Sequence, residues 1–499
     1  MNDASDAMTL IWGWGWGWGW GWGWGWGWGW VLLVVQTLLG LGAAWHALLN
    51  KRDSRSALGW MVVALGLPIA GPVAYLLFGI NRVRARARRS NRPSPAVSAE
   101  LRSPGGAGLP VSGLSDLARA GAIISGMPLR PGNRITALRN GEQAYPAMLE
   151  AIAAAAVSVD LSTYIFENNA TGHRFVEALA AAQQRGVRVR VLLDGMGEWY
   201  SPGIRRRLRR DGFDARSFNR PRLLPPNLAV NLRNHRKLLV VDRAVAFAGG
   251  INIGDRHLLA PPCIKHPVAD LHFQLGGPVV GDLQRVFNDT WRQVGGDGSA
   301  TVDAMDIPAD EATGVTGSSQ CRVIADGPDE NLDQLALVLQ SAVSAARHSV
   351  RIMTPYFLPS RELIAGLQSA ALRGVAVTIL LPERSNLPYV HWATRNLLWE
   401  LLHREVRVFY QPPPFNHSKL VVVDEGYVLL GSANIDPRSL RLNYELGVEV
   451  FDPAFGAEMS GLFDALVERS RPVTGAEMAG RSLAVRTRDA LCWLFSPYL

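Results

Sequence analysis

A short motif occurs twice in this chain of 499 residues, and the repetition constrains the fold more than any other feature. The two segments are HRKLLVVD, which begins at His235, and HSKLVVVD, which begins at His417. Each is followed, at the same spacing, by a glycine-containing turn with an asparagine: GGIN ends at Asn252 and GSAN ends at Asn434. Two matches with identical internal spacing, 182 residues apart, are very hard to obtain by chance. The chain therefore contains two copies of one structural unit.

The segments around the two motifs follow a common order of elements. The predicted strands are VSVDLSTYIF (157–166) and RGVRVRVLLD (185–194) in the first half, and HSVRIMTPYF (348–357) and RGVAVTILLP (373–382) in the second. A helical stretch separates the strands of each pair, which predicts parallel strands covered by helices. We therefore expect an α/β fold of two tandem domains related by pseudo-twofold symmetry. The domains are expected at 131–318 and 319–499, because residues 295–319 have the composition of a linker.

The start of the chain is apolar and rich in tryptophan. Residues 12–30 alternate Trp and Gly, and an apolar run continues over 31–49. One helix over both would be roughly 57 Å long, about twice a hydrocarbon core of ~30 Å, so we place the first membrane span at 31–49. A second uncharged run, 57–80, predicts the second span, since membrane helices tolerate its two prolines. The predicted order is a tail over residues 1–30 and then a transmembrane helical hairpin over 31–80.

The flanks of this hairpin predict its orientation. A basic stretch and linker is expected over 81–130, and Arg82 to Arg92 include six arginines, against three basic residues between Lys51 and Arg55. The positive-inside rule then places the rest of the chain in the cytoplasm. A cleavable signal peptide is not expected, because the first residues are acidic and the apolar block is too long. The Trp-Gly repeat is a tolerated expansion without function, or a segment along the lipid headgroups, where tryptophan is favoured, or an oblique extension of the first span.

Charge and cysteine usage narrow the class of protein. Lys and Arg number 51 against 43 Asp and Glu, and this excess fits a partner that carries phosphates, either nucleic acid or an anionic bilayer. The three cysteines are widely separated and have no ligand spacing, so neither a disulfide framework nor a zinc site is expected. A reducing compartment is the expected location.

The repeated motif predicts a phosphate site. Two residues apart on a strand, the His and Lys of each motif share one face, and the Asp lies on the other. The residues are His235, Lys237 and Asp242 in the first copy, and His417, Lys419 and Asp424 in the second. One histidine can attack phosphorus while the other protonates the leaving oxygen, and the two then exchange roles. The lysines and the amides of Asn252 and Asn434 would hold the non-bridging oxygens, so no metal and no cofactor are expected.

Two further carboxylates are candidates for orienting the histidines. A nucleophilic imidazole needs an acceptor for its second nitrogen. Asp270 follows His235 by 35 residues and Glu445 follows His417 by 28, each in an apolar-flanked segment, so each is expected to serve the histidine of its own half. The alternative is an ordinary surface carboxylate at a strand edge.

Other polar residues have plainer interpretations. Asp242 and Asp424 lie on the opposite strand face, so a structural role toward backbone or arginine groups is the better interpretation. The basic run RRRLRR at 205–210 is typical of a solvated helix face, with contact to lipid headgroups as the alternative.

The duplicated motifs resemble those of the phospholipase D superfamily, and further segments resemble bacterial cardiolipin synthases. These segments are the paired spans ending in YLLFG, NHRKLLVVDRAVAFAGGINIGD, TPYFLPS, GSANIDPRSLRLNYE and the closing SPYL. The resemblance covers residues 31–499 and leaves out the Trp-Gly repeat. It implies two phospholipase D-like domains in a multi-pass protein of the bacterial inner membrane, with the catalytic domains on the cytoplasmic side.

The resemblance also implies a reaction. Phosphatidylglycerol gives its phosphatidyl group to an enzyme histidine, glycerol leaves, and a second phosphatidylglycerol attacks to give cardiolipin. The superfamily's habit favours His235 as the nucleophile and His417 as acid and then base, with matched roles for the two lysines and the two asparagines. The implied partners are phosphatidylglycerol and anionic membrane lipids, with no nucleic acid; no oligomeric state is implied.

Three alternatives remain at this point. A phospholipase D that hydrolyses or exchanges headgroups, such as a phosphatidylserine synthase, shares the two motifs and differs in the acceptor. A nuclease of the superfamily would suit the positive charge but would gain nothing from a membrane hairpin. An inactive membrane scaffold would not need two intact His/Lys pairs.

Overall fold

The chain forms two compact units, Met1–Arg89 and Ser90–Leu499, which are described in turn. The computed structural model describes residues 22–51, 54–79, 113–220, 232–260, 265–295, 317–329 and 331–496. The first part of the Trp-Gly repeat, the arginine cluster at 82–92 and residues 296–316 of the predicted linker lie outside these described residues.

A long first helix dominates the N-terminal unit. The elements are α1 (Trp22–Asn50), α2 (Ser54–Gly66), α3 (Ala70–Ala74) and the π-helix η1 (Tyr75–Gly79). Within α1, the stretch Trp30–Asn50 is long and apolar enough to cross a membrane, and most of its residues are not covered by the rest of the protein. Such exposure of large apolar side chains is expected where lipid is the solvent. A helix with the length and composition of the first predicted span is therefore present, and it begins earlier, inside the Trp-Gly repeat.

The second apolar run does not form the continuous helix that was predicted. α2 ends at Gly66, and the chain breaks at Pro68 and Ile69, whose φ is 58°, before α3 begins. Proline lacks the N–H donor of a helix interior and clashes with the preceding turn, which accounts for the break. The 13 residues of α2 span roughly 20 Å, less than the ~30 Å of a hydrocarbon core. Within the described residues, one helix rather than two has the length and composition of a membrane span.

The second unit consists of two similar α/β halves. The first half contains α6 (Ser115–Ser125), β1 (Arg130–Arg139), α7 (Asn140–Ala154), β2 (Ser158–Thr163), α8 (Ala170–Gln184), β3 (Arg188–Asp194), α9 (Gly197–Tyr200), α10 (Ile204–Arg210), β4 (Asp214–Phe218), β5 (Arg233–Asn234), β6 (Leu238–Val241), β7 (Val245–Gly249), η2 (Asp255–His257), β8 (Val268–Ala269), β9 (Leu271–Gly276) and α11 (Val279–Gln293). The second half contains β10 (Ser319–Asp326), α13 (Gln334–Ala345), β11 (Ser349–Met353), α14 (Arg361–Leu372), β12 (Ala376–Pro382), α15 (Pro388–Leu402), β13 (Arg407–Gln411), β14 (Phe415–Asn416), β15 (Leu420–Val423), β16 (Tyr427–Gly431), α16 (Pro437–Arg441), β17 (Asn443–Phe451), α17 (Pro453–Glu468), β18 (Arg471–Pro472), α18 (Gly475–Ala479) and α19 (Leu483–Leu494). All four strands predicted from the sequence are present, as β2, β3, β11 and β12.

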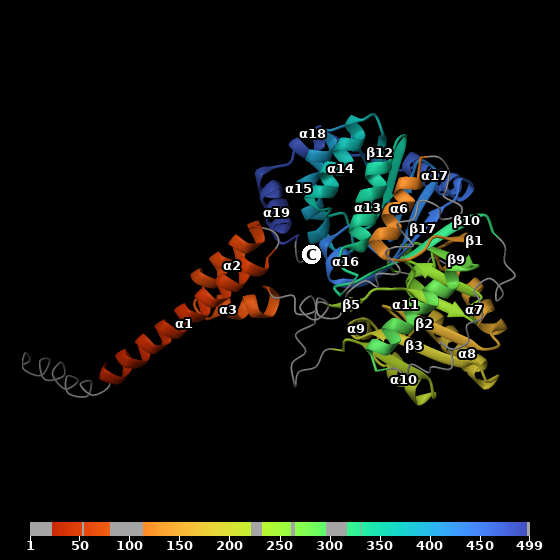
Figure 1. Cartoon of the computed structure of the whole chain (residues 1–499), viewed down its shortest axis with the longest axis horizontal. Helices are drawn as coiled ribbons and strands as arrows, with labels where there is room; N and C mark the ends of the chain where they lie inside the picture. Colours follow the sequence, from red (N-terminus) through yellow and green to blue (C-terminus); the bar gives the residue numbers. More distant parts are fainter. Residues whose placement is uncertain are drawn as a thin grey trace, which may run out of the picture. The chain divides into compact units, whose positions relative to one another are not determined.

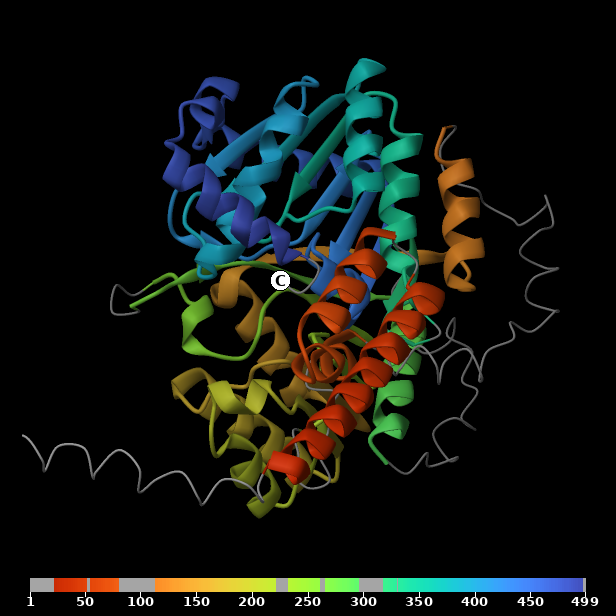
Figure 2. The ribbon, with the colours of Figure 1, turned by 90° about the vertical axis from the view of Figure 1, so that its left-hand side faces the viewer.

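One sheet runs through both halves with pseudo-twofold symmetry. From the centre outward, the first half reads β1-β9-β7-β6-β2-β3-β4 and the second reads β10-β17-β16-β15-β11-β12-β13, so corresponding strands occupy corresponding places. The halves join where β1 pairs antiparallel with β10. Figures 1 and 2 show the two halves on either side of this junction, each with helices against its sheet. The predicted duplicated α/β architecture is confirmed.

Three layers of apolar side chains hold the sheet and helices together. One cluster packs α7, α8 and α10 on the first half, and a second packs α13, α14 and α15 on the other. The third cluster draws side chains from both halves, including Phe273 and Trp291 from the first and Val448 and Phe463 from the second. Because this central core is shared, the halves form one folded body rather than two independent domains.

A helix lies inside the segment that was expected to be linker. α6 buries Leu117 and Ala118, which join the core of the second half together with Leu114. Nη1 of the buried Arg322 also donates to the backbone oxygen of Ala118, at 2.8 Å. The expected linker over 81–130 is therefore wrong for the residues from Ser115 to Ser125.

Candidate active site

Each motif histidine reaches across to the opposite half of the sheet. β5, directly before His235, pairs in parallel with β17, and β14, directly before His417, pairs in parallel with β8. The ladder continues into the histidines themselves: the N–H of His235 donates to the oxygen of Tyr444 (2.9 Å), and that of His417 donates to the oxygen of Ala269 (2.7 Å). The backbone of each histidine is thus fixed by the other half.

Each candidate carboxylate also contacts the histidine of the opposite half. Nδ1 of His235 lies 3.0 Å from the carboxylate of Glu445, and Nδ1 of His417 lies 2.8 Å from Oδ2 of Asp270. The sequence prediction that each carboxylate serves the histidine of its own half is wrong, because the cross-half strand pairs bring the opposite histidine to each of them. With Nδ1 donating to a carboxylate, Nε2 of each imidazole is left as the unprotonated nitrogen in the neutral ring.

Glu445 is held as a carboxylate by several donors. The hydroxyl of Ser432 donates to it at 2.5 Å and the amide of Asn443 at 3.0 Å. Burial favours a raised pKa for Glu445, but the adjacent His235 and Lys237 and the Ser432 hydroxyl outweigh it, so the pKa lies below its ordinary value. A buried carboxylate that accepts several hydrogen bonds stays ionised and can stabilise an imidazolium beside it.

Asp270 occupies the corresponding place with a different neighbour. A Cβ added at Gly250 would lie 2.2 Å from Oδ1 of Asp270, so a side chain at this position would displace the carboxylate from its present place. Gly250 corresponds to Ser432 in the second copy of the glycine turn, where the hydroxyl donates to Glu445 instead. The variable position of the G-[GS]-x-N turn therefore touches the orienting carboxylate in both halves.

The two motif lysines are buried beside the histidines. Lys237 is 2% exposed and Lys419 is 6% exposed. Nζ of Lys237 donates to the backbone oxygen of His235 at 2.6 Å, and Nζ of Lys419 donates to that of His417. Burial lowers the pKa of Lys237 to about 7 and that of Lys419 to about 8, although both carboxylates, Glu445 and Asp270, oppose the shift. The charges of both Glu445 and Asp270 act on each lysine, so the two lysines and the two carboxylates face a common centre.

Both imidazoles are neutral in this environment. Burial lowers the pKa of His235, with Glu445 opposing the shift and Lys237 adding to it. Burial together with Lys419, Lys237 and His235 holds the pKa of His417 well below its ordinary value. A neutral imidazole can act as a nucleophile or base, and a bound anion between the lysines would favour protonation of one of them.

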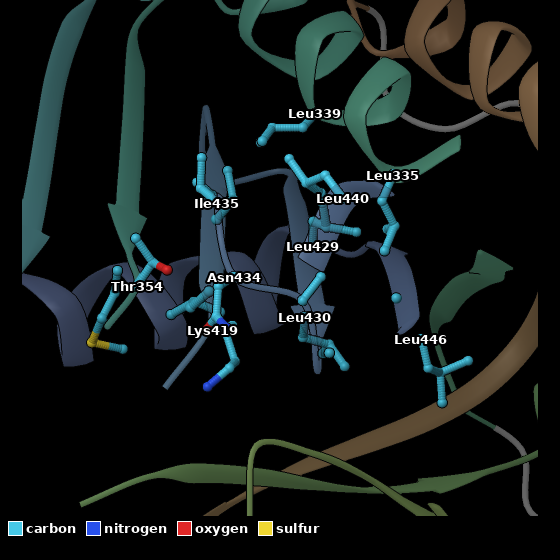
Figure 3. A pocket seen from close by; sticks show the side chains of 16 residues that line it. Leu335, Leu339, Thr354, Lys419, Leu429, Leu430, Asn434, Ile435, Leu440 and Leu446 are labelled. Atoms are coloured by element: carbon cyan, nitrogen blue, oxygen red, sulfur yellow. The ribbon is translucent and has the colours of Figure 1, made fainter. Parts of the chain in front are cut away.

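The motif asparagines are buried and hydrogen-bonded. Oδ1 of Asn252 accepts from the backbone N–H of Ile165 at 3.1 Å, and Nδ2 of Asn434 donates to the hydroxyl of Ser439 at 3.1 Å. Asn434 and Lys419 also line a small, mainly apolar cavity of about 40 Å³ behind the second motif (Figure 3). Such a volume holds a water molecule or two and not an acyl chain. The phosphate-binding role of the asparagines stays a prediction.

Asp242 and Asp424, which complete the two motifs, hold the backbone. Asp242 accepts from the N–H groups of Ala156, Val157 and Ser158 at 2.7–2.8 Å, which ties the hairpin turn after β6 to the start of β2. Asp424 does the same for the three residues at the start of β11, the N–H groups of Arg347, His348 and Ser349. Neither carboxylate is directed at the histidines, in agreement with the structural interpretation.

Two tyrosines at the site were not singled out in the sequence. The ring of Tyr164 lies 5.1 Å from that of His235 and 5.4 Å from Nζ of Lys237. The ring of Tyr356 lies 6.3 Å from that of His417, and its hydroxyl donates to Asn386 at 2.7 Å. Both tyrosines lie near the end of a predicted strand, in TYIF and TPYF, and this shared position was the signal available. Within the described residues, no cluster of three His, Cys, Asp or Glu side chains has the spacing of a metal site.

Comparisons with known proteins identify relatives of both units. A family described as "Cardiolipin synthase, PLD-like domain" matches residues 148–260 and 339–467, and one described as "Phospholipase_D-nuclease N-terminal" matches residues 30–79. Cardiolipin synthase A of Pseudomonas aeruginosa is 33% identical over 87% of this chain and 89% of its own. The protein of the same name from Pseudomonas entomophila is 31% identical over 93% and 96%.

A solved structure shares the fold. The crystal structure of a phosphatidylserine synthase from Haemophilus influenzae superposes with a TM-score of 0.59, covering 77% of this chain and 100% of that one, at 16% identity. At this identity the likeness concerns the fold alone.

Proposed function

Because this chain belongs to the cardiolipin synthase family of phospholipase D-like proteins, we propose that it joins two phosphatidylglycerol molecules into cardiolipin and glycerol. The observation that supports the proposal is the pair of partly buried imidazoles, each with Nδ1 at a buried carboxylate of the opposite half and with a buried lysine beside it. Such a centre offers two equivalent nitrogens and two cations to one phosphodiester, which is what a double displacement at phosphorus requires.

In the first step, Nε2 of His235 attacks the phosphorus of one phosphatidylglycerol. The P–N bond forms as the bond from phosphorus to the glycerol oxygen breaks, and Nε2 of His417 gives its proton to that oxygen, so that free glycerol leaves. His417 must therefore be protonated when the diester is bound. The negative phosphate between Lys237 and Lys419 offsets the two ammonium groups that depress the pKa of His417 in the free site.

In the second step, the neutral His417 accepts the proton of the terminal hydroxyl of a second phosphatidylglycerol. That oxygen attacks phosphorus, the P–N bond breaks, and cardiolipin leaves with His235 restored. Lys237, Lys419 and the amides of Asn252 and Asn434 would stabilise the charge on the non-bridging oxygens in both steps. Glu445 and Asp270 are proposed to keep the two rings in the required tautomer.

The test is the product of purified full-length protein in phosphatidylglycerol vesicles. We expect cardiolipin and glycerol in equal amounts, with labelled phosphatidyl trapped on His235 after rapid denaturation and absent from His235→Ala. Phosphatidic acid as the main product would indicate a hydrolase instead. Efficient transfer to an added alcohol such as serine, in preference to phosphatidylglycerol, would indicate headgroup exchange. Label found on His417 alone would reverse the roles of the histidines.

We further propose that the protein is integrated in the bacterial inner membrane with its catalytic unit in the cytoplasm. One long apolar helix, Trp30–Asn50, and the arginine excess at 82–92 support this topology. A reporter that works only inside the cell, fused after Leu499, should be active. Activity of a periplasm-specific reporter at the same position would overturn the orientation and leave the chemistry untouched.

A further inference from the structure

A basic helix at the surface of the first half is not used by the proposed mechanism. α10 has the sequence IRRRLRR, and its two apolar residues, Ile204 and Leu208, are fully buried in the core. Anchoring one face of the helix in this way turns the arginines outward, and Arg206, Arg209 and Arg210 are exposed. The basic face is therefore a fixed feature of the fold.

Exposed aromatic residues stand beside these arginines. α9, the short helix before α10 (Figure 1), leaves Trp199 70% exposed and Tyr200 62% exposed. A surface hollow is lined by Trp199, by four of the α10 arginines and by Arg220 from the end of β4. An exposed tryptophan costs free energy in water, and it is the residue type that prefers the headgroup region of a bilayer.

Few carboxylates balance the positive charge. Glu198 lies near Arg205 (3.7 Å) and Arg220 (3.5 Å), and Asp211 lies near the arginines at the end of α10. No ion pair of Arg206 or Arg209 is found within the described part of the chain. Burial lowers the pKa of Arg205, Glu198 opposes the shift, and the neighbouring Arg220 and Arg209 add to it. The surface therefore keeps a strong positive excess.

This surface adjoins the active site. The ring of Tyr200 lies 6.4 Å from that of Tyr164, which in turn lies 5.1 Å from the ring of His235. A lipid layer in contact with Trp199 and the α10 arginines would consequently lie close to His235, which the lipid substrates must reach.

We propose that α9 and α10 form a docking surface for the anionic face of a bilayer, with Trp199 at the headgroups and Arg206 and Arg209 paired with lipid phosphates. The surface acts in addition to the N-terminal membrane helix and presents the catalytic entrance to the lipid layer. Arginine beside an exposed tryptophan suits phosphate headgroups at an interface, because charge and amphipathic area are supplied together.

The first test measures contact between the α9/α10 surface and the bilayer, and it does not depend on catalytic turnover. In full-length protein with Cys263→Ser and Cys492→Ser, a Pro202→Cys variant would carry an environment-sensitive fluorophore beside Trp199. Reconstituted in vesicles of phosphatidylcholine with 30% phosphatidylglycerol, the label should be quenched by lipids that carry a spin label near the headgroup. Quenching should fall in pure phosphatidylcholine, in 1 M NaCl, and in Arg206→Gln/Arg209→Gln. Equal quenching in pure phosphatidylcholine, or no quenching in either vesicle, would overturn the proposal.

A further arm separates a bilayer surface from a pocket for free phosphate. Inorganic phosphate and chloride at equal ionic strength should weaken quenching equally, because both act by screening. Much stronger competition by phosphate would assign the hollow to a discrete anion and overturn the docking surface.

The second test is kinetic. Arg206→Gln/Arg209→Gln should raise the mole fraction of phosphatidylglycerol needed for half-maximal rate by roughly five- to twenty-fold, since each basic residue near an anionic surface contributes about fivefold in affinity. The maximal rate should stay close to that of the wild type. The matched control is Arg404→Gln/Arg469→Gln, which removes two exposed arginines from the second half. An equal rise of this mole fraction in the two double variants would overturn the proposal. If the proposed synthase function itself were wrong, the wild-type protein would already fail to make cardiolipin.

Discussion

The exchange of carboxylates between the halves makes a specific prediction for Glu445→Gln. Asn443 and Ser432 both donate to the carboxylate, at 3.0 and 2.5 Å. The side-chain amide introduced by Glu445→Gln can keep its oxygen toward Asn443. Its NH2 group can donate to the Ser432 hydroxyl, which can rotate to accept. His235 then keeps a neutral acceptor at Nδ1 and loses the charged one. A hydrogen bond to a charged group contributes about 1.5–3 kcal/mol, so kcat should fall roughly 10- to 150-fold with little loss of stability.

The assay for this prediction compares two leaving groups. Glycerol needs the proton of the general acid, whereas p-nitrophenolate leaves without one. If His235 is the nucleophile, His417→Ala should regain formation of the phosphohistidine on a phosphatidyl p-nitrophenyl ester, and His235→Ala should not. Because Glu445 contacts His235, Glu445→Gln should behave like a weak form of His235→Ala. Asp270→Asn should behave like a weak form of His417→Ala.

The comparison separates the pairing of residues from the choice of nucleophile. If His417 proves to be the nucleophile, both patterns reverse together and the cross-half pairing stands. The reasoning is refuted if Glu445→Gln follows His417→Ala while Asp270→Asn follows His235→Ala. In that case each carboxylate would act on the histidine of its own half during turnover.

Three further predictions follow from the same site. Asp242→Ala removes the acceptor of three backbone N–H groups and should destabilise the protein by about 2–4 kcal/mol, seen as a lower melting temperature, while Asp242→Asn should lose less. Burial lowers the pKa of Lys237 to about 7 and that of Lys419 to about 8, so both lysines lose their charge as pH rises, and kcat/KM should decline between pH 7 and 8. Lys237→Arg should move this decline of kcat/KM to higher pH. An unchanged pH profile in that variant would contradict the role of Lys237. Thorough chelation should leave the rate in a detergent assay unchanged, and a loss restored by one divalent ion would contradict the metal-free mechanism.

The fold of the catalytic unit was predictable because its information is local and repeated. β2, β3, β11 and β12 are apolar runs at matching places in the two halves, and the histidine motifs fix the register between the copies. The structural role of Asp242 was predictable for a similar reason. The strand-face argument gave the right outcome, although Asp242 lies in the turn directly after β6, with a φ of 52°, rather than on the strand itself.

The errors lie where distant segments decide the outcome. Sequence distance linked Glu445 to His417, but the pairing of β5 with β17 brings His235 to it, and no local pattern encodes that pair. α6 was missed because its surroundings have a linker's composition, although Leu114, Leu117 and Ala118 have the spacing of a buried helix face. The second span stays a prediction, because the structure shows only that the helix of this apolar run is interrupted at Pro68.

The exchange of residues explains why both copies must belong to one rigid body. Each histidine takes a backbone hydrogen bond and an orienting carboxylate from the other half, so a small shift between the halves would disturb the backbone N–H and the Nδ1 contact of both histidines at once. Catalytic groups must be held within about 0.5 Å of their working geometry, and a continuous sheet joined at β1 and β10 over a shared core provides that stiffness. The symmetry is nevertheless incomplete. Glu445 has the Ser432 hydroxyl where Asp270 has the bare Gly250, so the carboxylates that contact the two imidazoles have unequal surroundings.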